Sequence, residues 1–153
     1  MHWRRVMALL IGLGGFAAGG APPRLVKVVP LLLDEQGRTA LAPSLFERDA
    51  YQAELRANRD RASGVRFDVL ARRVPRDRPL TLRLELRGSG GPETRTVEVP
   101  WDGRGLVGRW TRVDLTGEAF RDLGQVIAWR ASLRDGGTEL AAQQSFLWRD
   151  EVK

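Results

Sequence analysis

The sequence predicts a mostly β protein, an antiparallel immunoglobulin-like β-sandwich of about seven strands with one inserted helix near residues 44–58. Two observations carry this prediction. From Ser63 onward, apolar and polar residues alternate in short runs, which is typical of strands with one face on a core and the other in water. Turns rich in glycine and proline separate these runs. Because the chain has no cysteine, the disulfide of antibody domains is absent, and an open barrel is the alternative architecture.

The first strand is predicted over residues 24–33, where the chain is almost continuously apolar. Pro30 lies inside it and favours an edge strand or a bulge, because proline has no N–H to donate to a ladder. The Asp-Glu-Gln-Gly sequence at 34–37 then predicts a turn.

The helix follows this turn. Ser44 and the glutamate three residues later have the spacing of a capping box, which predicts that the helix begins there. Tyr51 and Leu55 lie four residues apart and therefore share one face. We expect Leu45 and Phe46 to help pin the helix to the domain.

The later elements follow from the alternation and from glycine stops. A short helix is predicted over 116–123, capped by Thr116 and stopped by Gly124. An Asp-Gly-Gly sequence joins the last two strands as a hairpin. The remaining strands are expected at 65–69, 80–86, 94–99, 109–115, 125–134 and 138–148. In the last two strands the core-facing residues are expected to be Ile127, Trp129, Ala131, Leu133, Leu140, Ala142, Phe146 and Trp148.

The first twenty residues predict a secretory signal peptide, residues 1–20. A basic head at 1–5 precedes an apolar run at 6–16, and small residues follow. The apolar run is shorter than the roughly 20 residues that cross a bilayer as a helix, so no permanent membrane span is expected. Cleavage before Ala21, or one residue earlier, leaves residues 21–153 as a single β-sandwich domain. The predicted location is the periplasm or the extracellular space.

The formal charge is +6, and acidic and basic residues are interspersed along most of the chain. The densest basic cluster contains Arg72, Arg73, Arg76 and Arg78. We interpret it as a solvated turn between two strands, with a polyanion-binding loop as the alternative. Nucleic acid is not an expected partner, because no aromatic residue lies between these arginines to stack on bases.

Residue types exclude much catalytic chemistry. The single histidine, His2, lies in the predicted leader, and there is no cysteine. The remainder therefore cannot form a Ser-His-Asp or Cys-His site or a histidine- or cysteine-ligated metal site. We predict no catalytic residue, metal or cofactor. Residues 103–108 match G-x-G-x-x-G, but the sequence after them alternates like a strand, whereas a dinucleotide site requires a helix there.

Tryptophan positions suggest one binding surface. Trp129 and Trp148 are expected in the core, and Trp101 at its edge. If Val113 and Leu115 point inward, then Trp110, Arg112 and Asp114 point outward from the same strand. An exposed tryptophan beside charged groups can stack on a sugar ring or anchor a protein partner. The alternative is that the glycine-rich loop before it shifts the register and buries Trp110.

Several stretches are distinctive as a set: VVPLLLDEQGR at 28–38, PSLFERDAYQAEL at 43–55, SGVRFDV at 63–69, IAWR at 127–130 and QSFLW at 144–148. Together they resemble a group of short, uncharacterised bacterial proteins predicted to be secreted. The group has no assigned activity, so the resemblance implies only that residues 22–153 form one exported domain.

The sequence thus favours an exported, non-catalytic β-sandwich that binds a protein partner. A carbohydrate-binding domain is the first alternative. A small hydrolase that depends on a pair of carboxylates is the second. Assembly through an exposed edge strand, such as the strand of Pro30, is also open.

Overall fold

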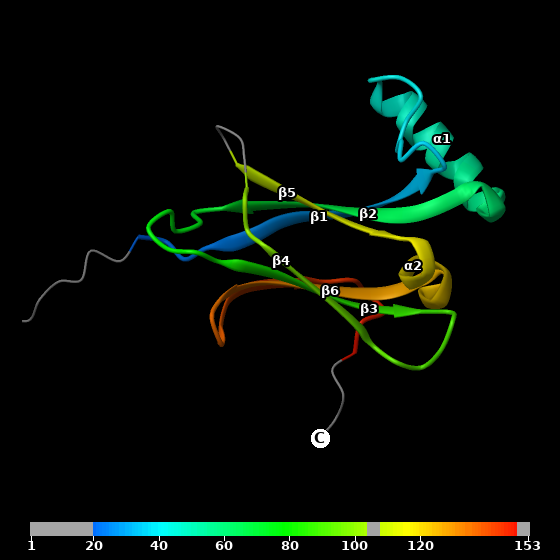
Figure 1. The fold of residues 1–153 in the computed structure, drawn as a ribbon. Helices are drawn as coiled ribbons and strands as arrows, with labels where there is room; N and C mark the ends of the chain where they lie inside the picture. The colour runs from blue at the N-terminus through cyan, green and yellow to red at the C-terminus, as the bar shows by residue number, and fades with distance from the viewer. Residues whose placement is uncertain (1–19, 104–107, 150–153) are drawn as a thin grey trace, which may run out of the picture.

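The computed structural model describes residues 20–103 and 108–149. The predicted signal peptide, apart from Gly20, and the middle of the glycine-rich loop lie outside the described residues. Within them, seven strands form two antiparallel sheets, as predicted (Figure 1). The strands are β1 (Arg24–Asp34), β2 (Ala62–Arg72), β3 (Thr81–Gly88), β4 (Arg95–Pro100), β5 (Arg109–Thr116), β6 (Val126–Asp135) and β7 (Thr138–Gln144).

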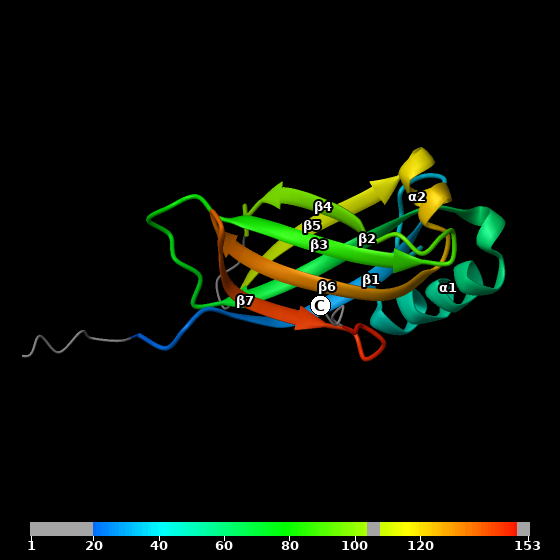
Figure 2. The same cartoon turned by 90° about the horizontal axis from the view of Figure 1, so that it is seen from below.

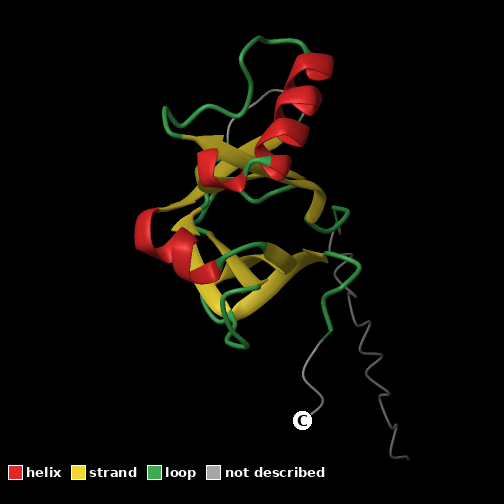
Figure 3. Ribbon diagram, turned by 90° about the vertical axis from the view of Figure 1, so that its right-hand side faces the viewer, coloured by secondary structure: helices red, strands yellow, loops and turns green. Residues whose placement is uncertain are grey.

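The two sheets have the strand orders β1-β2-β5 and β4-β3-β6-β7. This is an immunoglobulin-like arrangement in which the fourth strand pairs with the third instead of with the fifth. Figure 3 shows the sheets as two layers viewed from the end that carries both helices. Along one side of the sandwich β7 lies beside β1 (Figure 2).

The core between the sheets follows directly from the alternation. In β3, Leu82, Leu84 and Leu86 are at most 1% exposed, while the arginine and glutamate residues between them reach the outer face. They meet Val65, Phe67 and Val69 of β2 in one continuous apolar cluster. Trp101 is 8% exposed in the same cluster, at the end of β4, as expected.

Helix α1 (Leu45–Ala57) is capped by Ser44, whose hydroxyl accepts a hydrogen bond from the backbone N–H of Glu47. Tyr51 and Leu55 are buried beside Leu32 of β1, as the helical spacing predicts. The prediction that Leu45 and Phe46, in the first turn of α1, pin the helix to the domain was wrong.

Leu45 is 68% and Phe46 is 82% exposed, so neither pins the helix to the domain. The buried face of α1 is set by residues 51, 52 and 55. At about 100° per residue, position 46 points almost opposite that face, whereas position 45 is in line with Gln52 but lies two turns before it.

Two irregularities overturn part of the inward set predicted for β6 and β7. Ile127 is an extra residue between two β3–β6 pairs, and this bulge leaves it 50% exposed. A second register shift lies beside Leu140, so Ala142 pairs with Ser132 on the outer face. Strand β7 ends at Gln144, and Phe146 is 97% exposed instead of buried.

Helix α2 (Gly117–Leu123) begins after Thr116 and ends at Gly124, which has a positive φ of 67°. These bounds match the prediction, although the Thr116 side chain forms no capping hydrogen bond. The end of α2 rests on the turn after β3. A Cβ atom at Gly88 would lie 1.9 Å from the backbone oxygen of Leu123, so only glycine fits there.

The free edge of β1 is partly blocked. Gln52 of α1 accepts a hydrogen bond from the Leu32 N–H at 2.7 Å and donates to the Leu32 carbonyl at 2.9 Å. Its amide therefore takes the place of a neighbouring strand. Pro30, two residues away, has no N–H to offer. The structure confirms the edge strand, and these two residues oppose its use for assembly.

Candidate functional site

The candidate site lies on the outer face of the β1-β2-β5 sheet, at β5. Thr111, Val113 and Leu115 are buried, and the residues between them point away from the core. Trp110 is accordingly 40% exposed. The alternative in which the glycine-rich loop shifts the register and buries Trp110 is excluded, because β5 pairs continuously with β2 from Arg109 onward.

Arg112 and Asp114 share this outer face with Trp110, and each lies directly opposite a residue of opposite charge on β2. Asp114 accepts two hydrogen bonds from Arg66, at 2.7 and 2.8 Å. This contact raises the pKa of the Arg66 guanidinium, although partial burial opposes the effect. Arg112 lies 3.4 Å from Asp68 in a looser pair.

An open hollow of about 620 Å³ lies beside Trp110. Five side chains line it: Arg48, Asp68, Asp102, Trp110 and Arg112. Of the three residues predicted from the sequence, two line the hollow, and Asp114 lies outside it.

Sequence reasoning missed three residues of this hollow because they come from other elements. Arg48 belongs to α1, Asp68 belongs to β2, and Asp102 follows β4. Asp102 is held in place by the Thr111 hydroxyl, which donates a hydrogen bond to it at 3.1 Å. No local sequence signal connects any of these three residues with Trp110.

Asp34, at the end of β1, positions the helix that carries Arg48. Its carboxylate accepts hydrogen bonds from the Tyr51 hydroxyl at 2.7 Å and the Arg38 side chain at 2.7 Å. It also accepts from the backbone N–H groups of Gln36 and Arg38. Burial raises the pKa of Asp34, but these hydrogen bonds outweigh it and lower the pKa from 3.8 to about 2.

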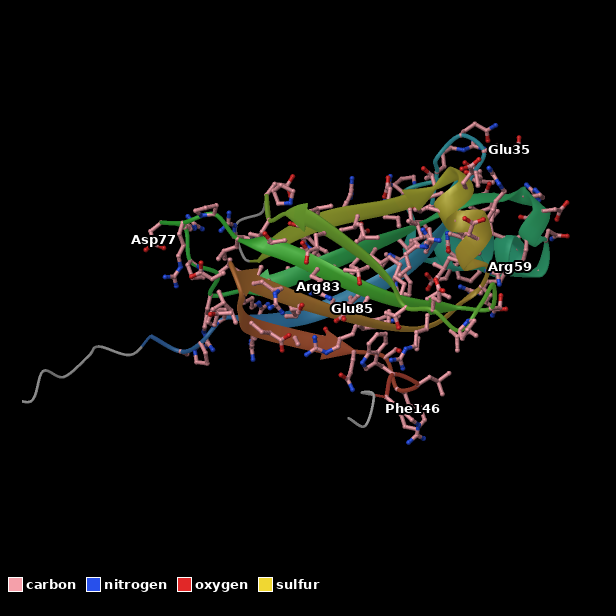
Figure 4. All side chains as sticks on the ribbon, turned by 60° about the horizontal axis from the view of Figure 1, so that its bottom comes forward. Glu35, Arg59, Asp77, Arg83, Glu85 and Phe146 are labelled. Atoms are coloured by element: carbon pink, nitrogen blue, oxygen red, sulfur yellow. The ribbon has the colours of Figure 1, made fainter. Side chains whose placement is uncertain are left out.

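A second exposed feature is the turn after β7, which sequence reasoning placed inside a strand. The Ser145 N–H donates a hydrogen bond to the Trp129 carbonyl, and the Ser145 hydroxyl accepts one from the Trp129 N–H. The Trp148 ring packs 4.2 Å from the Arg87 guanidinium on the outer sheet face. Trp148 is therefore buried outside the main core. Phe146 lies at the surface (Figure 4). The polar run Gln143-Gln144-Ser145 is the signal that ends the strand early.

The hollow has two carboxylates, Asp68 and Asp102, which is the minimum requirement of the hydrolase alternative. A carboxyl group that acts as a general acid at neutral pH needs an apolar surrounding. Here Asp68 faces Arg112, and Asp102 bonds to Thr111. The arrangement suits the binding of polar groups better than proton transfer.

Within residues 20–103 and 108–149, no three or more acidic, histidine or cysteine side chains gather as metal ligands. Neither helix in this part of the chain has the length and apolar character needed to cross a membrane. Comparison with protein-family models, with curated proteins and with solved structures found no match. The resemblance to secreted bacterial proteins therefore stays a prediction.

Proposed function

We propose that this protein is an exported, non-catalytic binding module that holds a protein partner on the outer face of its β1-β2-β5 sheet. The observation that carries the proposal is the 40% exposure of Trp110 at a hollow lined by arginine and aspartate. Tryptophan and arginine are the residue types that most often supply binding energy at protein interfaces. A rigid sheet holds Trp110 in place, so little side-chain freedom is lost on binding.

The charged groups beside Trp110 favour a protein over a sugar. Arg66 and Asp114 bond to each other, Arg48 bonds to Asp49, and Asp102 bonds to Thr111. Groups paired in this way form a polar rim, whereas a sugar site needs donors and acceptors that are free for hydroxyl groups.

One observation supports the carbohydrate alternative. Oδ1 of Asp68 is buried and accepts no hydrogen bond within the described residues, although Arg112 lies 3.4 Å away. A sugar hydroxyl that donates to this oxygen, with the ring stacked on Trp110, would use both groups.

Photo-crosslinking in the native host tests the proposal. Lys27 lies in the same cross-strand row as Leu70 and Trp110, about 10 Å from Trp110 at the usual strand spacing. A benzophenone side chain at position 27 is expected to give one discrete protein adduct, and Trp110→Ala is expected to abolish it.

The matched control places the same group at Glu98, which is exposed on β4 of the other sheet. Equal adducts at both positions, or an adduct that survives Trp110→Ala, would contradict the proposed surface. Quenching of Trp110 fluorescence by soluble oligosaccharides, without any protein adduct, would instead establish the carbohydrate alternative.

Export is tested by the intact mass and N-terminal sequence of the protein recovered from each cell fraction. The proposal expects a chain that begins near Gly20 or Ala21 outside the cytoplasm. A full-length chain in the cytoplasm would contradict it, and a full-length chain at the membrane would make residues 1–20 an anchor.

A further inference from the structure

The end of the sandwich opposite the helices carries a cluster of arginines. Arg24 begins β1 and pairs in register with Arg72 at the end of β2. Arg73, Arg76 and Arg78 follow in the loop to β3, and all five are exposed. Figure 1 shows this loop projecting from the end at which β1 begins, and in Figure 4 Asp77 marks its tip. We call these five arginines the arginine end.

Most of the arginine end lacks compensating charge. On the sheet faces, arginines lie beside acidic residues, as Arg66 does beside Asp114. At the arginine end, Arg78 pairs with Asp135 at 3.1 Å. Within the described residues, the other four form no ion pair, and the loop itself has a single acidic residue, Asp77.

Two features make this arrangement unfavourable within the isolated chain. Arg24 and Arg72 lie directly opposite each other, and like charges in that position destabilise a sheet. Arg73 has a φ of 58°, a left-handed conformation that is uncommon for residues other than glycine. Backbone strain of this kind persists where the surrounding structure imposes it, and it is concentrated at functional positions.

We propose that the arginine end binds the phosphate groups of an anionic membrane surface. Arginine binds phosphate through two parallel N–H groups. No aromatic side chain lies between the arginines, which disfavours single-stranded nucleic acid. The loop projects instead of lining a groove, and this shape suits a flat surface (Figure 2).

The order of the sequence also supports a membrane. The apolar run at 6–16 ends eight residues before Arg24, a span of at most about 28 Å when fully extended. Before the predicted cleavage, a leader in a bilayer therefore keeps Arg24 of the arginine end within that distance of the bilayer. The sandwich then stands on its end, so the hollow beside Trp110 on the sheet face stays open to a protein partner.

The test is binding of the protein, as recovered from its host, to vesicles at 0.1 M salt. One set contains phosphatidylcholine alone, and the other contains about 30% phosphatidylglycerol, which supplies the anionic surface. Binding to the anionic set alone is expected, and raising the salt concentration to about 1 M is expected to remove it. Equal binding to both sets, or binding to neither, would overturn the proposal.

Two triple variants locate the surface. In the first, Arg72, Arg73 and Arg76 become glutamine, which removes three unpaired charges at the arginine end. An arginine near an anionic surface contributes about fivefold to partitioning, so this variant is expected to bind about 100-fold more weakly. The control, R56Q/R59Q/R121Q, removes three charges at the helical end, beyond the screening length of about 10 Å. Its binding to anionic vesicles is expected to stay within a few-fold of that of the natural protein.

The comparison between the triple variants cancels any contribution from a retained leader, and thermal unfolding verifies that both are folded. Equal weakening in the two would overturn the assignment to the arginine end. Binding to heparin or single-stranded DNA without binding to vesicles would overturn the assignment to a membrane. Trp110→Ala is expected to bind vesicles within twofold of the natural protein. Failure of this proposal is therefore distinguishable from failure of the proposed protein-binding surface.

Discussion

Replacement of Asp34 by asparagine is expected to remove a pH-dependent part of the stability. The native-state pKa of about 2, against an ordinary 3.8, corresponds to about 2 kcal/mol of stabilisation when the carboxylate is charged in both states. Because the pKa is lowered by folding, this stabilisation is complete above about pH 4 and is lost as the pH falls from 3.8 to about 2. The side chain is only 5% exposed, so solvent screens it little.

Urea unfolding, followed by tryptophan fluorescence between pH 2 and 6, measures this effect. The difference in unfolding free energy between the natural protein and Asp34→Asn is expected to shrink by about 2 kcal/mol as the pH falls from 5 to 2. Asp49→Asn is the matched control, because the Asp49 side chain is 70% exposed and its surface pair contributes little. A difference that is the same at pH 5 and pH 2 would refute the role of the carboxylate in holding α1.

Two further substitutions probe the contacts around the helices. Gly88→Ala is expected to lower the stability by about 3 kcal/mol, because the new Cβ would lie 1.9 Å from a backbone oxygen of α2. Gly91→Ala, where a Cβ would have no atom within 4 Å, is expected to be nearly neutral in thermal unfolding. Gln52→Leu leaves the backbone N–H of Leu32 without its partner and is expected to lower the stability by about 2–4 kcal/mol. It is also expected to promote self-association, measured by sedimentation, because the edge of β1 is uncovered. Gln36→Leu, at an exposed position, is expected to have neither effect. Equal stability of the two glycine variants, or monomeric behaviour of Gln52→Leu, would contradict these contacts.

The parts of the fold predicted correctly are those that depend on local pattern. The alternating leucines of β3 specify a buried face without reference to the rest of the chain. The same logic on β5 placed Trp110 outside, because Val113 and Leu115 had to be inside. Ser44 marked the start of α1, since a cap is a property of neighbouring residues.

The errors lie where the regular period is interrupted. One extra residue at Ile127 turns that side chain outward, while Trp129, Ala131 and Leu133 keep the predicted inward direction, and nothing in the sequence alone marks this bulge. Beyond Gln144 the chain leaves the sheet, so Phe146 and Trp148 no longer follow strand alternation. Phe46 was placed by its apolar character, although helix geometry turns it toward solvent.

The hollow could be predicted only in part, because its walls come from separate elements. Trp110 and Arg112 share a strand, and one alternation places both. Arg48 reaches the hollow through α1, whose placement depends on the buried contact between Tyr51 and Asp34. Contacts of this kind join residues that are distant in sequence, and neither periodicity nor composition reports them.

The most direct test of the central claim compares oxidative labelling of the tryptophans in living cells and in the purified protein. Trp110 is 40% exposed, and Trp101 is 8% exposed and serves as an internal reference. Trp110 is expected to be readily oxidised in the purified protein and strongly protected in the native host, where the partner covers it. Trp101 is expected to be unreactive in both settings. Equal oxidation of Trp110 in the two settings would contradict a protein-binding surface at this position.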